Sequence, residues 1–142
     1  MNTVLIVSLA AVVVGIALWF AIVRMRRVVG RGREAVAGLD RQATATSLGF
    51  ASGGGRGHCT IGVDATRFVV ALWSPPLTTE IRVTRIVAVE AARTREGRSG
   101  RDVLRVRFRA ADGAEDAVDL VVADVPGWVD ELRRRAKPRR AR

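Results

Sequence analysis

The sequence predicts one membrane-spanning helix followed by a small, mainly β domain that ends in an α-helix. Residues 3–23 carry no charge, which is typical of a membrane span. Residues 46–123 alternate apolar and polar side chains between frequent turn signals, as strands do. Residues 124–135 then repeat apolar side chains at helical spacing. We expect six or seven antiparallel strands closed by this one C-terminal α-helix.

The 142 residues leave room for a single domain after the span. The expected segments are a transmembrane helix at 3–23, a basic juxtamembrane linker at 24–45, the β domain at 46–135 and a basic disordered tail at 136–142. Of the 24 basic residues only Lys137 is lysine, a preference that indicates a GC-rich bacterial genome.

The apolar segment at residues 3–23 reads TVLIVSLAAVVVGIALWFAIV. As a helix it is roughly 31 Å long, close to the hydrocarbon thickness of a bilayer. Ser8 is tolerable there because its hydroxyl can bond back to the helix backbone. Trp19 and Phe20 lie near the C-terminal end, where aromatic rings favour the membrane interface.

A cleaved secretory signal is the main alternative to a lasting anchor. The first three residues lack Lys and Arg, the apolar run exceeds the ~7–15 residues of a signal core, and Arg24 follows it where a cleavage site needs small residues. We therefore expect an uncleaved anchor. Because the nearby arginines all follow the span, the positive-inside bias predicts a single-pass protein of the cell membrane, with its N-terminus outside and its domain in the cytoplasm.

The net charge of +10 is concentrated in the two flanks of the domain. It is +4 in residues 24–43, −1 in residues 44–131 and +7 in residues 132–142. Basic flanks attract polyanions. Anionic lipid is the simpler choice for an anchored chain, and nucleic acid is not expected because aromatic residues do not interleave with the charges. The candidate anionic-lipid contacts are Arg24, Arg26, Arg27, Arg31, Arg33, Arg133, Arg134, Arg135, Lys137, Arg139, Arg140 and Arg142.

The linker should extend the first helix by a few turns and then loosen, because Gly30, Gly32 and Gly38 each cost roughly 1 kcal/mol in a helix relative to Ala. The strands are then expected at 46–50, 58–63, 67–73, 80–83, 86–92, 103–110 and 117–122.

The clearest strand is 103–110, where apolar and basic residues alternate. Its outward row is a candidate ligand face formed by Arg105, Arg107 and Arg109. A flat face of this kind can meet phosphate or carboxylate. The alternative is a solvated face in which these arginines pair across strands with Glu115, Asp116 and Asp119.

The closing helix has clear signals at its start and along one face. Asp124 is a suitable N-cap, and Pro126 suits the first turn. The apolar stripe that should face the core is Val125, Trp128, Val129 and Leu132.

Four segments carry a resemblance to a known fold: TRFVVALW, TEIRVTRIVAVEAAR, DVLRVRFRAADG and VPGWVDELRRR. Over residues 57–135 the chain resembles small bacterial PH-like or GRAM-like domains, and as a whole it is similar to single-pass bacterial membrane proteins of unknown function that carry one. The resemblance implies a PH-like β-barrel with the helix closing one end, and a lipid- or peptide-binding role. The basic signature of inositol-lipid binding is absent from the first hairpin, around Asp64. An open β-sandwich is the alternative architecture.

Catalytic chemistry finds little support in the sequence. His58 and Cys59 are adjacent, and adjacent residues of a strand point to opposite faces, so we expect a surface histidine and a buried cysteine. One Cys with one His does not supply a zinc site. The glycine-rich run at 53–57 lacks the ending of a phosphate-binding P-loop. We expect no enzyme activity, no cofactor and no metal.

The predicted function is therefore that of a non-catalytic binding or adaptor domain, anchored at the cytoplasmic face of the membrane. It would contact anionic lipid or a protein partner. The alternative is a structural or assembly subunit of a larger membrane protein complex, whose helix packs with other helices through small residues such as Gly15.

Overall fold

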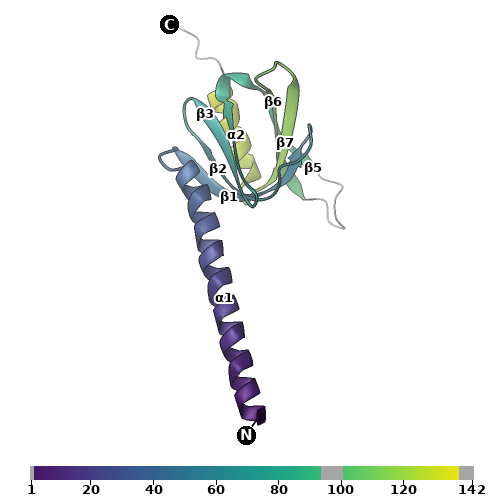
Figure 1. The fold of residues 1–142 in the computed structure, drawn as a ribbon. Coiled ribbons are helices and arrows are strands. Elements are labelled where there is room, and N and C mark those ends of the chain that lie inside the picture. Colours follow the sequence, from purple (N-terminus) through teal and green to yellow (C-terminus); the bar gives the residue numbers. More distant parts are fainter. Residues whose placement is uncertain (1, 94–100, 138–142) are drawn as a thin grey trace.

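The computed structural model describes residues 2–93 and 101–137, and Figure 1 presents its fold. Helix α1, Asn2–Ala35, leads into a seven-stranded antiparallel sheet, and helix α2, Val125–Ala136, follows the sheet. The strands are β1 Arg41–Phe50, β2 Arg56–Val63, β3 Arg67–Trp73, β4 Pro76–Arg82, β5 Ile86–Arg93, β6 Asp102–Arg109 and β7 Glu115–Val121. A short 3-10 helix, η1 Val83–Arg85, joins β4 to β5.

Helix α1 is long and apolar enough to cross a membrane. It projects away from the domain over most of its length (Figure 1), and its apolar side chains are exposed there. The Ser8 hydroxyl donates to the backbone carbonyl of Val4 at 2.9 Å, so the helix itself satisfies this polar group, as the sequence predicts. The predicted N-terminal apolar helix is confirmed.

The expected linker at 24–45 does not form a separate segment. Helix α1 continues to Ala35, and β1 begins at Arg41, before the expected start of the domain at residue 46. Gly30 and Gly32 do not end the helix, and Gly32 is buried against the sheet. The chain turns at Gly38, whose φ of +80° favours glycine.

The strand order is β4-β3-β2-β1-β7-β6-β5, in one continuous sheet. This confirms the predicted number of antiparallel strands and the closing helix. A closed barrel is not supported, because the two edge strands of the sheet, β4 and β5, do not pair with each other. Helix α2 packs against η1, β5 and β6 inside the curve of the sheet (Figure 1).

Strand β1 joins the two halves of the sheet. It pairs with β2 along most of its length and with β7 near its end, and the register shifts between Ser47 and Gly49. Gly49 has a φ of +110°, and its N–H donates to the Ser47 hydroxyl at 3.2 Å. Such a bulge bends a strand, so the sheet curves around the core.

Helix α2 closes the core as the sequence predicts. Asp124 caps its first turn by accepting a hydrogen bond from the N–H of Gly127 at 3.1 Å. Trp128 is buried against Phe68, with ring centroids 6.4 Å apart. The buried residues of the helix are the predicted stripe, Val125, Trp128, Val129 and Leu132.

Candidate functional site

The C-terminal part of α1 packs directly on the outer face of β2 and β3. Met25, Val29, Gly32 and Val36 lie on one side of the helix, because a helix turns 100° per residue. Gly32 is buried against Trp73: a Cβ atom at Gly32 would lie 2.7 Å from Trp73 Nε1. Only a residue without a side chain allows this approach.

The contact continues past the end of α1 at Ala35. Val36 and Leu39 are buried with Val69 in a small cluster separate from the main core. Gly62 of β2 leaves room for the Leu39 side chain, since a Cβ atom at Gly62 would lie 2.6 Å from Leu39 Cδ1. On the same face, Trp73 Nε1 donates to Thr60 Oγ1 at 2.8 Å. The last turns of α1 are therefore part of the domain.

Two consecutive residues after α1 bind opposite ends of α2. Asp40 accepts from Arg135 Nη1 at 2.9 Å. Arg41 donates from Nη2 to Asp124 at 3.0 Å and lies over the Trp128 ring, 4.7 Å from its centroid. The segment that joins α1 to β1, the sheet and α2 are thus connected to one another.

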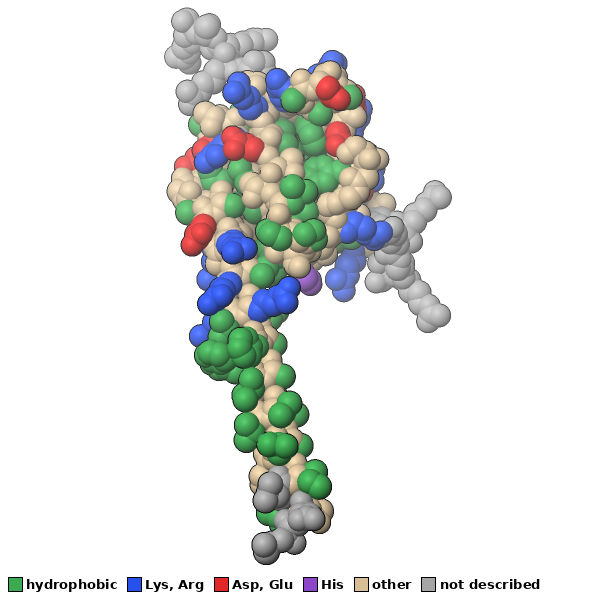
Figure 2. Space-filling model, in the orientation of Figure 1, with side chains coloured by type: hydrophobic (Ala, Val, Ile, Leu, Met, Phe, Trp, Pro, Cys, Tyr) green, Lys and Arg blue, Asp and Glu red, His purple; other side chains and the backbone are tan. Residues whose placement is uncertain are grey.

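The five arginines that follow the apolar segment in α1 are exposed, close to where the helix meets the domain. Figure 2 shows Lys and Arg side chains gathered where the apolar helix meets the domain. Among the described residues, no carboxylate forms an ion pair with any of these five. They are Arg24, Arg26, Arg27, Arg31 and Arg33, the basic belt of the molecule.

The arginines of α2 have a different setting. Arg133 Nε donates to the Val89 carbonyl at 2.8 Å, and Arg134 and Arg135 both donate to Glu131 at 2.6 Å. The hydrogen bond from Arg134, followed by that from Arg135, holds the pKa of Glu131 below its ordinary value.

Helix α2 ends on the side of the domain opposite the N-terminal part of α1 (Figure 1). Lys137 is exposed at this end. Three of the candidate lipid contacts, Arg139, Arg140 and Arg142, lie outside the described residues. Within the described chain, Arg133 and Arg135 bind other parts of the domain, at Val89 and Asp40, whereas Arg134 binds only Glu131 of its own helix.

The arginine row of β6 is largely neutralised by β7. Arg105 binds Asp119 through two hydrogen bonds, at 2.8 and 2.9 Å, and Arg107 pairs with Glu115. Arg109 is exposed, without an ion pair among the described residues. Two of the three residues proposed as a ligand face are therefore occupied by cross-strand ion pairs.

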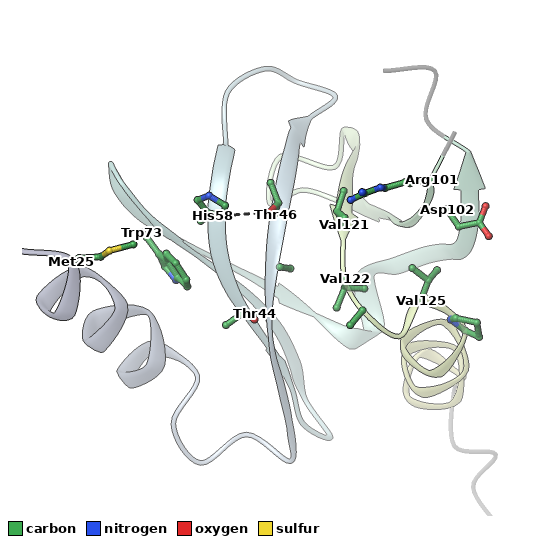
Figure 3. Close-up of a pocket in the computed structure, with 13 residues that line it drawn as sticks. Met25, Thr44, Thr46, His58, Trp73, Arg101, Asp102, Val121, Val122 and Val125 are labelled. Atoms are coloured by element: carbon green, nitrogen blue, oxygen red, sulfur yellow. Dashed lines mark hydrogen bonds between the residues drawn. The ribbon is translucent and has the colours of Figure 1, made fainter. Parts of the chain in front are cut away.

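An open groove of about 790 Å³ lies on the outer face of the sheet beside α1. Figure 3 shows its floor on β1 and β2, with α1 on one side and the end of β7 on the other. We call it the outer groove; the residues that line it include Met25, Thr46, His58, Trp73, Arg101 and Val121. Sequence reasoning missed it, because these residues come from six separate segments and form no motif.

The floor of the outer groove is polar and its walls are partly apolar. His58 Nδ1 and Thr46 Oγ1 are 3.3 Å apart, a hydrogen bond drawn dashed in Figure 3. The His58 and Trp73 rings lie close together, with centroids at 5.7 Å. The second ring nitrogen of His58, Nε2, has no hydrogen-bond partner among the described residues. The groove therefore combines hydrogen-bonding groups with an aromatic ring and a thioether.

His58 and Cys59 are placed as predicted, on opposite faces of β2. Cys59 is fully buried in the core, and burial raises the pKa of its thiol to about 11. His58 is exposed in the outer groove. The two side chains do not form a nucleophile and base pair.

The acidic residues of β7 each have a separate partner in the protein. Asp116 accepts from the Ser52 N–H at 3.0 Å and from its hydroxyl at 2.6 Å, which fixes the β1–β2 loop. Asp119 and Glu115 bind the β6 arginines. Within residues 2–93 and 101–137, no group of three or more Asp, Glu, His or Cys converges on one point.

Comparison with protein-family models and with curated proteins gives no match for this chain.

Proposed function

We propose that this chain is a membrane-anchored, non-catalytic adaptor whose β domain lies on the cytoplasmic face of the cell membrane. There it contacts anionic lipid or a protein partner. We also propose that the domain is PH-like; seven antiparallel strands followed by one amphipathic helix support this assignment.

One observation carries the proposal: α1 passes from its apolar segment into direct contact with the sheet. Gly32 lies nine residues after Val23, the last residue of the apolar segment, or about 14 Å along the helix axis. The domain therefore begins close above the lipid headgroups, which occupy about 5–7 Å on each side of a bilayer. An anchor on a long mobile linker would leave the domain free of the surface.

The basic belt supports contact with anionic lipid. Arg24, Arg26 and Arg27 lie within about 6 Å of the end of the apolar segment, at the depth of the lipid headgroups, and Arg31 and Arg33 lie about 12–15 Å beyond it, beside the sheet contact. Each arginine near an anionic surface contributes about 1 kcal/mol of attraction. The same belt favours the cytoplasmic side through the positive-inside bias.

The chemistry of the described residues supports a binding role. Cys59 is buried, and its raised pKa keeps it protonated at neutral pH. Asp116 and Asp119 are occupied by Ser52 and Arg105. No nucleophile, base and orienting group are brought together in the described part of the chain.

Topology is the first test. We expect a fluorescent protein fused after Arg142 to be bright in cells, and alkaline phosphatase at the same position to be inactive. The full mass of the chain should be retained in the membrane fraction. An active phosphatase fusion, or a mature chain shortened by about 25 residues, would refute the anchored cytoplasmic arrangement.

Lipid contact is tested with the full chain purified from vesicles that contain phosphatidylglycerol and phosphatidylcholine. Mass spectrometry then measures the phosphatidylglycerol that stays bound. Replacing Arg24, Arg26 and Arg27 with Gln should lower this amount. The matched control replaces three exposed domain arginines, Arg82, Arg85 and Arg109, and should leave it unchanged. Equal losses in both triple variants would contradict a role for the belt.

A protein partner, or a place in a larger complex, is favoured by the free edges of the sheet. Outside α1, the exposed large apolar side chains are Leu77 on β4 and Val87 on β5, which are 52% and 47% exposed. Unpaired edge strands can accept a strand from another chain. Leu77→Lys should reduce the size of the native membrane complex on a gel, whereas Thr78→Lys, on the other face of β4, should not.

A further inference from the structure

We propose that the outer groove holds the headgroup of an anionic phospholipid from the leaflet in which α1 ends. This inference rests on the proposed function, because it requires α1 to span the bilayer and the domain to lie at its surface. It assigns a ligand to a site other than the β6 arginine row and the arginines of α2.

The first argument is the depth of the groove. Met25 lies two residues after the apolar segment, about 3 Å beyond the hydrocarbon boundary along the helix. Trp73 packs at the level of Gly32, about 14 Å beyond that boundary. The groove thus runs from headgroup depth at Met25 to the level at which α1 meets the sheet. Figure 2 shows the single histidine, His58, on the side of the domain that faces the apolar part of α1.

The second argument is the continuity of the α1 contact stripe. Val36 and Gly32 are covered by the sheet, but Met25, on the same side of the helix, is 67% exposed. The sheet ends short of Met25, and the groove opens there. A lipid from the adjoining leaflet would cover this side chain with its glycerol and upper acyl region while its headgroup enters the groove.

The third argument is the match of charge and hydrogen-bonding groups. Arg101 and Asp102 lie on one wall, and Figure 3 shows Arg101 directed toward Val121 and Asp102 directed away from the groove. Arg93 Nε lies 3.6 Å from the Asp102 carboxylate, so Arg101 supplies the positive charge of this wall. The floor offers the Thr46 hydroxyl and the His58 ring, of which Nε2 has no described partner. Phosphate oxygens are acceptors for all of these groups. An amphipathic anion with one phosphate at the interface therefore fits better than a neutral lipid.

The test uses the single histidine as a reporter in the full chain. Protein with isotope-labelled histidine is placed in phosphatidylcholine nanodiscs with increasing phosphatidylglycerol, at fixed pH. We expect the one imidazole signal to shift and saturate with phosphatidylglycerol and to broaden with a headgroup spin-labelled lipid. Arg101→Gln should raise the phosphatidylglycerol fraction at half-saturation by about fivefold, the effect of one interfacial arginine.

The second measurement uses a variant in which a large side chain fills the groove. Thr44 lies on the floor and is exposed, so Thr44→Trp should fill the groove and abolish the shift. Thr78→Trp is the matched control, because Thr78 is an exposed strand threonine on β4, away from the groove. The control should keep the wild-type shift, and circular dichroism checks that both variants fold.

The outcomes separate this proposal from the one on which it rests. If the fusions place the domain outside the cell, both proposals fall. If the fusions and the basic-belt variants behave as expected but the His58 signal is the same with and without phosphatidylglycerol, only the groove assignment falls. A shift of equal size in Thr44→Trp would also overturn it, because the lipid would then act from elsewhere.

Discussion

Gly30 and Gly32 lie two residues apart in α1 but meet different surroundings. A side chain at Gly32 would collide with Trp73 and Thr60, whereas a Cβ at Gly30 has nothing within 4 Å. Gly32→Leu should therefore lower the free energy of unfolding by about 2 kcal/mol through overpacking. Gly30→Leu should raise it by up to about 1 kcal/mol, since leucine favours the helix.

Thermal unfolding of the two variants in detergent, with limited proteolysis of the segment 24–40, measures this difference. Gly32→Leu should expose the segment to cleavage, because α1 would leave the sheet. Similar stability and protection in both variants would show that the close approach at Gly32 is unimportant.

Cys59 predicts a dependence of stability on alkaline pH. Its thiol pKa is about 11 in the folded protein, against 9.0 for the ordinary group. The folded state therefore binds this proton more tightly, so the stability is fully present below pH 9.0 and is lost as pH rises toward 11. The free energy of unfolding should fall by about 2 kcal/mol over this range.

Cys59→Ala is the control, because it removes the thiol. The chain has no tyrosine and one lysine, so few other groups titrate between pH 9 and 11. Urea unfolding at several pH values should give a smaller slope for Cys59→Ala than for the wild type. Parallel pH profiles would contradict the assignment to Cys59.

At the scale of elements, two neighbouring arginines of α2 differ in their contribution to stability. Arg135 binds both Glu131 and Asp40, and its side chain is 14% exposed, whereas Arg134 binds only Glu131 and is 70% exposed. Arg135→Ala should destabilise the domain by about 1–2 kcal/mol, because Asp40 loses its partner on α2. Arg134→Ala should change stability by less than about 0.5 kcal/mol. Chemical unfolding of both variants measures the difference, and equal effects would count against the link from Asp40 to α2.

The elements that sequence reasoning located are those with a local signal. Strand alternation and turns placed most of the β-strands, but β4 begins at Pro76 and not at residue 80, and β1 begins at Arg41 and not at residue 46. The spacing of Trp128 and Leu132 with the Asp124 cap placed α2. The cross-strand pairing of Arg105 and Arg107 with acids of β7 was one of two alternatives, and it follows from simple alternation on neighbouring strands.

The features that sequence reasoning missed depend on contacts between distant segments. Gly32 was counted as a helix breaker, although its missing side chain is what lets α1 pack on Trp73. The open sheet depends on whether the edge strands β4 and β5 pair with each other, which alternation within each strand does not encode. The outer groove joins residues from Met25 to Pro126, and no local pattern brings them together.

At the scale of the whole molecule, the height of the domain above the bilayer should control the lipid response. Seven alanines inserted between Arg27 and Val28 add two helical turns, about 10 Å, and keep the contact stripe in register. We expect unchanged unfolding of the domain but loss of the His58 shift with phosphatidylglycerol. Seven alanines added after Arg142 are the control. A retained shift in the first variant would show that height does not matter.

The unbroken passage of α1 into the sheet has a mechanical consequence. A membrane helix tilts when its apolar length exceeds the thickness of the bilayer around it. Because α1 has no joint between its apolar segment and Gly32, the domain must lean with the helix. A tilt of about 20° moves a point 30 Å above the boundary sideways by roughly 10 Å. Bilayer thickness would then determine how the free edges β4 and β5 are presented to the aqueous phase.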